Sequence, residues 1–143
     1  MPIMNYTTKI PASRTIAEIQ RILARYGASA ITTRYEEGKP SGLTFTITTE
    51  WAGTHTYILP ANIEGVWQRL IDDLGEHHRG ASMEQAARVA FRILKDWVQV
   101  QMALIEADMA EIDEIFLPYL QTPAGTSLYV AFVERGGNLL LNP

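Results

Sequence analysis

Polar side chains that could hold an anion recur along residues 82–107, at spacings of four, three and four residues. These spacings place them on one face of a helix, and the set consists of Arg88, Arg92, Lys95 and Gln99. A guanidinium group matches a phosphate or carboxylate with two parallel hydrogen bonds. Two interpretations follow: a solvated stripe whose charge Glu84 and Asp96 offset, or a cationic wall for an anionic ligand.

Two aromatic residues in the same segment extend the second interpretation. Phe91 and Trp97 could stack on a planar base while the guanidinium groups hold phosphates. The sequence therefore offers Arg88, Phe91, Arg92, Lys95 and Trp97 as candidate ligand-binding residues.

A second candidate lies where an earlier helical pattern ends. Gly27 is placed to stop that helix in a left-handed conformation. A glycine in this conformation also exposes backbone N–H groups, and such a nest can hold an anion. Arg25, Gly27 and Ala28 are therefore candidate ligand-binding residues as well as a helix stop.

Other groupings of reactive residues suggest less specific chemistry. His77 and His78 are adjacent in a loop and lack an evident third ligand. Five carboxylates near the end of the long helix could bind a metal or act as acid and base, although an exposed acidic face is the simpler interpretation. They are Glu106, Asp108, Glu111, Asp113 and Glu114. We expect no metal and no cofactor.

The elements that must position these residues divide the chain into two halves. Residues 4–10 predict a short strand, and Thr15 and Glu18 predict a capping box that opens a helix over residues 15–26. β-Branched and aromatic residues then predict strands over residues 29–35, 43–49 and 54–59. Within residues 43–49 apolar residues alternate with threonines, as in a half-buried antiparallel strand. The first half, about residues 4–60, is thus predicted to form an antiparallel sheet of about four strands with one packed helix.

The second half, about residues 62–134, is predicted to be helical. The predicted helices span residues 62–74, 82–107, 109–117 and 125–134, with a loose tail at 136–143. Asn62 can cap the first of them, and Ser82 with Gln85 predicts a capping box that opens the second. Apolar residues surround the long helix almost completely, more than one buried stripe requires. We expect a symmetric oligomer, a dimer or larger, built partly on this helix. The alternative is a well-buried central helix in a monomer.

Composition limits the possible classes of protein. The chain has 143 residues, which predicts a single α+β domain over 1–143. It has no cysteine, which excludes disulfides and thiolate chemistry and fits the cytosol. No segment approaches the length of a membrane span, so no membrane partner is expected. The net charge of −4 argues against a nucleic acid polymer as partner, although nine of the twelve cations are Arg.

Several stretches resemble a widespread group of small phage proteins. They are residues 5–10 (NYTTKI), 16–28 with its YGA end, 86–97 (AARVAFRILKDW) and 116–119 (FLPY). Over most of its length the chain resembles the Thoeris anti-defence sponge proteins of the first type.

This resemblance implies a function without catalysis. Such sponges sequester cyclic nucleotide immune signals in the host cytoplasm, chiefly cyclic ADP-ribose isomers, and so block bacterial anti-phage defence. The implied pocket lies at an interface of a homo-oligomer, with Phe91 for stacking and Arg88, Arg92 or Lys95 for the diphosphate. A second implied site, for cyclic trinucleotides, corresponds to Arg25, Gly27 and Ala28.

Two other functions remain open from the residues alone. The acidic balance and the apolar helix surface fit a phage protein that binds and inhibits a host enzyme. The acidic cluster near residues 106–114 fits a hydrolase.

Overall fold

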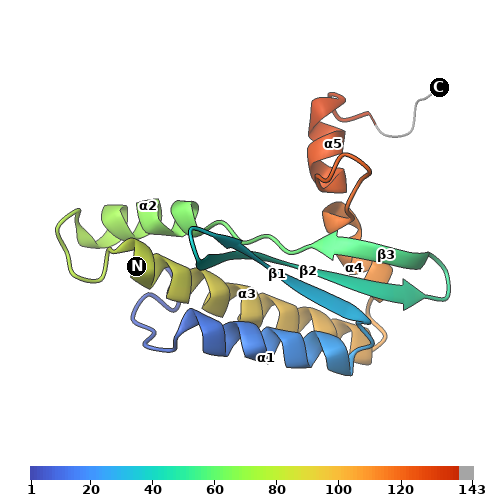
Figure 1. The fold of residues 1–143 in the computed structure, drawn as a ribbon, viewed down its shortest axis with the longest axis horizontal. Coiled ribbons are helices and arrows are strands. Elements are labelled where there is room, and N and C mark those ends of the chain that lie inside the picture. Colours follow the sequence, from blue (N-terminus) through green and yellow to red (C-terminus); the bar gives the residue numbers. More distant parts are fainter. Residues whose placement is uncertain (139–143) are drawn as a thin grey trace.

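A three-stranded antiparallel meander follows the first helix in the computed structural model, which describes residues 1–138 (Figure 1). The elements are α1 (Ala12–Arg25), β1 (Ala30–Glu36), β2 (Lys39–Thr49), β3 (Gly53–Ile58), α2 (Ile63–Leu74), α3 (Met83–Glu106), α4 (Ile112–Phe116), a 3₁₀ turn η1 (Leu117–Tyr119) and α5 (Leu128–Glu134). The α+β class is therefore confirmed, as is a strand-rich first half followed by helices.

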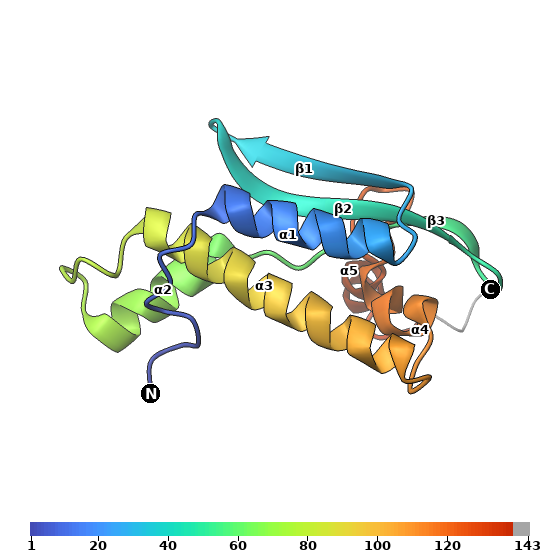
Figure 2. The ribbon, with the colours of Figure 1, turned by 90° about the horizontal axis from the view of Figure 1, so that it is seen from below.

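The sheet has the order β1-β2-β3, and its side chains alternate as predicted. Phe45 pairs with Ile31 on one side and Tyr57 on the other, and these residues share the inner face. On the outer face Thr46 and Thr56 join their hydroxyls at 2.7 Å. Figures 1 and 2 show α1 and α3 side by side against the inner face.

The prediction of a fourth strand over residues 4–10 is wrong. The N-terminal segment, residues 1–11, contains turns in place of a strand. Its backbone binds side chains of distant helices: the Ile3 N–H donates to Asp73 at 2.9 Å, and Gln85 Nε2 donates to the carbonyls of Tyr6 and Thr8 at 3.0 and 2.9 Å. These side chains satisfy backbone groups that a neighbouring strand would otherwise satisfy.

The N-terminal segment helps to lower the pKa of Asp73 in α2. Burial alone would raise the pKa of its carboxyl group, but the hydrogen bonds from Ile3 and Arg69 outweigh it and lower the pKa. The charged form of Asp73 therefore helps to fix the chain end on α2.

The predicted capping box at the start of α1 is also wrong. The helix begins three residues earlier, after Pro11, whose carbonyl accepts the N–H groups of Arg14 and Thr15. Thr15 is fully buried inside the helix, and Glu18 pairs with Arg92 of α3. The residues that resembled a cap serve contacts between the two helices.

The caps of α2 and α3 match the predictions more closely. Asn62 accepts the Gly65 N–H at 2.9 Å, and Ser82 accepts the Gln85 N–H at 3.0 Å. The reciprocal half of the predicted Ser82 capping box is absent, because the Gln85 side chain binds the N-terminal segment instead.

Helix α3 lies between α1 and α2 and contributes to two cores. Phe91, Leu94 and Val98 face the sheet and α1, while Ala86 and Val89 face α2. Its largest exposed apolar side chains are Met83 and Val100. The apolar surface of α3 is thus mostly covered within one chain and does not by itself require a second copy.

Aromatic rings close one end of the larger core. Phe45 stacks on Tyr57 at 5.4 Å between ring centroids, and Phe116 meets Phe45 and Trp97 edge to face at 5.2 and 5.6 Å. Burial raises the pKa of Tyr57, and the nearby negative charge of Asp113 raises it further.

The last helix, α5, extends away from the sheet and the longer helices (Figure 1). Helix α5 has no buried residue and projects from the side of the sheet opposite α1 (Figure 1). It begins at Leu128, three residues later than predicted. Of the predicted loose tail, residues 139–143 lie outside the described residues. Within the described residues no helix is long and apolar enough to cross a membrane.

Candidate ligand-binding site

Arg92, the central cation of the predicted wall, is engaged inside the fold. Its guanidinium donates to a Glu18 carboxylate oxygen at 2.7 Å and to the Thr15 hydroxyl at 3.4 Å. The Arg92 and Glu18 side chains are 17% and 22% exposed. This pair links α1 to α3, so Arg92 meets a carboxylate of its own chain where a ligand phosphate was expected.

Arg88 and Lys95 also have partners on their own helix. Arg88 donates to Gln85 Oε1 at 2.7 Å and to Glu84 at 3.3 Å. Lys95 donates to Gln99 Oε1 at 2.8 Å. The stripe exists as predicted, and its local contacts fit the interpretation of ordinary polar pairs better than that of a vacant anion site.

The two aromatic candidates lie in different surroundings from those expected. Phe91 is 0% exposed and belongs to the larger core, so the expectation that it stacks on a ligand fails for this conformation. Trp97 is half-buried and meets Phe116 and Tyr119 edge to face. Its remaining surface lines an apolar groove of about 380 Å³ with Ile93 and Val66.

The end of α1 confirms the predicted helix stop. Gly27 has φ of 104°, its N–H donates to the Ala24 carbonyl, and the Ala28 N–H donates to the Leu23 carbonyl at 3.0 Å. This pair of bonds is a Schellman motif. Both N–H groups are thereby used, so the predicted anion nest at Gly27 and Ala28 is not available.

Arg25 lies at the same helix end. Its guanidinium carbon is 5.8 Å from the centre of the Tyr26 ring. Both residues line a small cavity of about 250 Å³ between α1 and α3, together with Glu106. The acidic Glu106 makes this cavity less suited to an anion than a purely cationic one.

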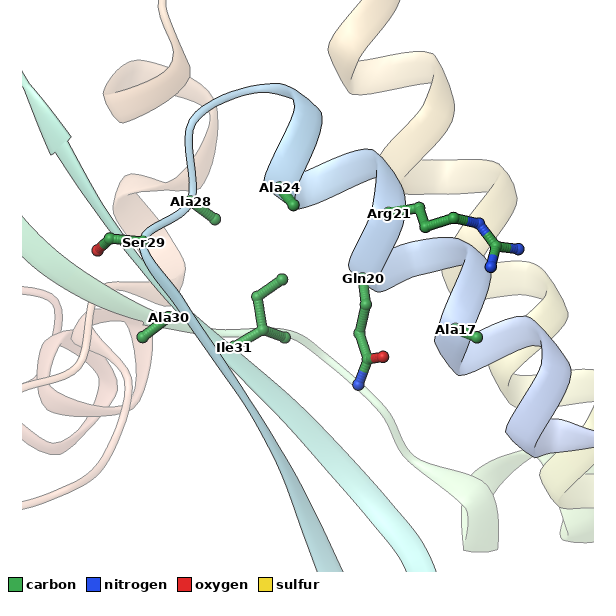
Figure 3. A pocket seen from close by; sticks show the side chains of 8 residues that line it. All are labelled: Ala17, Gln20, Arg21, Ala24, Ala28, Ser29, Ala30 and Ile31. Carbon is green, nitrogen blue, oxygen red and sulfur yellow. The ribbon is translucent and has the colours of Figure 1, made fainter.

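A larger groove of about 510 Å³ runs between the exposed side of α1 and strand β1 (Figure 3). Small apolar side chains and Ile31 line much of it, and Gln20, Arg21 and Ser29 supply its polar groups. The alanines are Ala17, Ala24, Ala28 and Ala30. Ala17 and Ala24 of α1 carry only methyl side chains, which leave space between the helix and β1 on either side of Gln20.

Arg21 stands at the rim of this groove without an acidic partner among residues 1–138. Figure 3 shows its side chain extended away from β1, whereas Gln20 and Ile31 point into the space between helix and strand. Gln20 Nε2 donates to the Thr33 hydroxyl at 3.3 Å, and the Ser29 hydroxyl donates to the Thr46 carbonyl at 3.3 Å. The groove therefore combines an apolar floor, two neutral polar groups and one free cation.

Sequence reasoning missed Gln20 and Arg21 and found only the neighbouring Ala28. The available pattern was the run of alanines at 17, 24 and 28, which breaks an otherwise bulky helix surface. Such a run is easily taken for ordinary helix propensity, and the paired strand that makes it a groove is distant in sequence.

The acidic cluster is not assembled as a metal site in the described residues. Within the described part of the chain no three His, Cys, Asp or Glu residues lie together as metal ligands. Glu114 accepts the Glu111 N–H at 3.1 Å, and Asp113 accepts the Glu114 N–H at 3.0 Å and the Thr49 hydroxyl at 3.2 Å. These carboxylates cap α4 and attach it to the sheet.

Comparison of the chain with family models, with curated proteins and with solved structures finds no match. The class of protein that the fold and the groove define is therefore an α+β protein with a candidate binding groove beside its first helix.

Proposed function

We propose that the protein is a phage-encoded sponge that binds a small anionic cyclic nucleotide between α1 and β1 and holds it without cleaving it. The observation that carries this proposal is the groove of about 510 Å³, in which the unpaired Arg21 stands beside an apolar alanine floor. Sequestration of an immune signal in the host cytoplasm would then block bacterial defence, as the sequence resemblance implies.

The size and chemistry of the groove support this class of ligand. Pockets for small molecules commonly have volumes of about 300–1,000 Å³ with few polar groups. Here a base can lie on Ile31 and the alanines, the Gln20 amide and Ser29 hydroxyl can bind its edge or ribose, and Arg21 can turn to meet a phosphate. None of the lining residues is a carboxylate or an imidazole that could act as general base.

The site differs from the one expected on α3. The cations of α3 are paired within the chain and Phe91 is buried. Of the two sites that the resemblance implies, we therefore favour the second, at the end of α1. Ala28 lines the groove, whereas Arg25 lies on the other side of α1. We therefore place the ligand one helix face away from Arg25.

Calorimetry with cyclic ADP-ribose isomers and with cyclic di- and trinucleotides tests the proposal. We expect one of these compounds to bind at micromolar or lower concentration, and mass spectrometry of the denatured complex to recover it intact. Absence of binding by every compound at 100-fold higher concentration would overturn the proposal, and recovery of a cleaved product would replace storage with catalysis.

Two matched variants locate the site. Arg21→Gln should weaken binding by about 1.5–3 kcal/mol, or roughly 10- to 150-fold, because one charged hydrogen bond is lost. Arg14→Gln on the same helix should leave affinity unchanged, since Arg14 is exposed and does not line the groove. Equal affinity of the two variants would place the ligand elsewhere.

A second candidate function rests on the free edge of β1. Within residues 1–138 the sheet order leaves the outer backbone groups of β1 without a strand partner, beside the same groove. An extended segment of a host enzyme could add to this edge, which fits an inhibitory protein. Recovery of one host protein in a stoichiometric complex, together with no nucleotide binding, would favour this function.

A further inference from the structure

A second pocket lies between the N-terminal segment and the loop that joins α2 to α3. It has a volume of about 390 Å³, and one of its walls is formed by residues 6–9. The end of α2 and residues 78–80 form the other wall, and Gln85 of α3 also lines it. Figure 2 shows the N-terminal segment passing beside the start of α3. This N-terminal pocket shares no lining residue with the α1–β1 groove, so the two are separate sites.

The charged side chains that line the N-terminal pocket are cations. Lys9 lies on one wall and Arg79 on the other, and no carboxylate lines the pocket. Both residues are exposed, and neither makes a hydrogen bond or an ion pair within residues 1–138. Like charges on opposite walls repel each other, and an anion between them would replace repulsion by attraction. The electrostatics of the pocket therefore favour an anionic ligand.

His78 adds a hydrogen-bond donor of defined position. Its Nδ1 accepts the Gly80 N–H at 2.8 Å, so the proton of the neutral ring lies on Nε2. No group in the described part of the chain accepts a hydrogen bond from this Nε2. One of the two adjacent histidines noted in the sequence thus offers a free N–H donor on a residue that lines the pocket.

Both walls are held in place by the chain itself. In the loop, the His78 N–H donates to the Gly75 carbonyl at 3.1 Å, and the Ala81 N–H donates to the His78 carbonyl at 3.0 Å. A Cβ on Gly80 would lie 3.2 Å from His78 Nδ1, so glycine allows this close turn. On the other wall, the Gln85 amide binds two carbonyls of the N-terminal segment. A pocket built in advance loses less conformational entropy when a ligand binds.

The remaining lining indicates the class of anion. A guanidinium, an ammonium and an imidazole N–H are together suited to the oxygens of a phosphate group. A phosphate monoester carries a charge of about −1.5 to −2 near neutral pH, which balances two cations. Each phosphate of a cyclic nucleotide is a diester with a single negative charge and balances them less well. Tyr6 and Leu74 add apolar surface beside the cations, which can cover the body of a small molecule.

We propose that the N-terminal pocket binds the terminal phosphate group of a small phosphorylated molecule. Lys9 and Arg79 hold the phosphate oxygens from opposite walls, and His78 Nε2 donates to one of them. The ligand differs in class from the cyclic diester assigned to the α1–β1 groove. Its binding would also join the N-terminal segment to the α2–α3 loop, so it would stabilise the attachment of that segment.

Calorimetry of the full chain with inorganic pyrophosphate and with 5′-AMP tests the proposal. The first probe is a bare phosphate compound, and the second carries its phosphate on a nucleoside. We expect at least one of them to bind with a Kd of about 1 mM or tighter. Binding of 5′-AMP alone would show that the surface of Tyr6 and Leu74 takes part. Absence of binding by both probes at about 10 mM would overturn the proposal.

Three variants that each remove one positive charge locate the phosphate. Arg79→Gln and Lys9→Gln should each weaken binding about tenfold or more, because each removes a charged hydrogen bond. Lys39→Gln is the matched control, since Lys39 is exposed and does not line the pocket, and its affinity should equal that of the parent chain. Equal losses in all three variants would indicate general charge attraction and refute the site.

Two further measurements keep this test separate from stability and from the proposed function. Arg79→Gln should keep the parent Tm without ligand, because Arg79 has no partner within residues 1–138. Amide hydrogen exchange in the N-terminal segment should slow when the bound probe is present, and unchanged exchange there would contradict a ligand that joins the two walls. Arg21→Gln in the α1–β1 groove should bind the probe like the parent chain, so failure of either proposal leaves the other standing.

Discussion

The pair between Arg92 and Glu18 gives the most direct test of the structure. The sequence predicts that Arg92 binds a ligand, whereas the structure shows it linking α1 to α3. A ligand-binding arginine can be removed without cost to the fold. An arginine that joins α1 to α3 cannot. We predict that Arg92→Ala destabilises the protein in the absence of any ligand.

The magnitude follows from the burial of the pair. Exposed ion pairs contribute about 0.2–1 kcal/mol, and removal of one partner of a fully buried pair costs about 3–5 kcal/mol. The two side chains here are 17% and 22% exposed and meet at 2.7 Å, so the pair falls between these limits. We expect a loss of about 2 kcal/mol, which corresponds to a fall in Tm of roughly 6 °C for a chain of this size.

Thermal and urea denaturation of Arg92→Ala, Glu18→Gln and the double variant measure the coupling. The sum of the stability losses in the two single variants should exceed the loss in the double variant by at least about 1 kcal/mol. Glu84→Gln is the matched control: the Glu84 side chain is 81% exposed and its pair with Arg88 should contribute less than about 0.5 kcal/mol. Additive losses, or an unchanged Tm for Arg92→Ala, would refute the assigned role.

Two further predictions concern the N-terminal segment and the aromatic cluster. Gln85→Leu should lower the free energy of unfolding by about 2 kcal/mol, because the carbonyls of Tyr6 and Thr8 lose their hydrogen-bond donor. Amide hydrogen exchange should accelerate selectively in the N-terminal segment. An equal acceleration across the whole chain would contradict this explanation. Tyr57 should ionise later than an ordinary tyrosine in an ultraviolet titration, and Tyr57→Phe should remove that late step. Because the folded-state pKa of Tyr57 lies above that of the unfolded state, its contribution to stability is complete below about pH 10 and declines as the pH rises further; the urea midpoint of Tyr57→Phe should therefore fall less steeply above pH 10, and parallel curves would count against this assignment.

The elements predicted well are those whose signals are local. Thr44, Thr46 and Thr48 alternate with apolar residues and form β2, and Asn62 and Ser82 cap the helices that follow them. In each case neighbours in sequence determine the conformation, so spacing alone was sufficient.

The errors arose where a distant partner decides the conformation. Residues 4–10 have the composition of a strand, but Gln85 of α3 binds the carbonyls of Tyr6 and Thr8 from 79 and 77 residues away in the sequence. Thr15 and Glu18 have the spacing of a capping box, but Arg92 draws Glu18 into a contact between helices. No periodicity within the first twenty residues carries that information.

The candidate site shows the same limit. Spacing placed Arg88, Arg92 and Lys95 on one face correctly, yet it could not show that each finds a partner inside the chain. The α1–β1 groove depends on how closely a helix and a strand approach, which the sequence of neither element specifies. Only Ala28 was common to the predicted and the observed candidate regions.

The attachment of the chain's first residues also has a consequence for biosynthesis. The acceptors and donors that hold Ile3, Asn5, Tyr6 and Thr8 belong to Asp73, Asp96 and Gln85, which the ribosome adds 70–91 residues later. This segment must therefore stay unanchored until α2 and α3 have been synthesised. A part of the chain that is made before its partners thus takes its final position only after them.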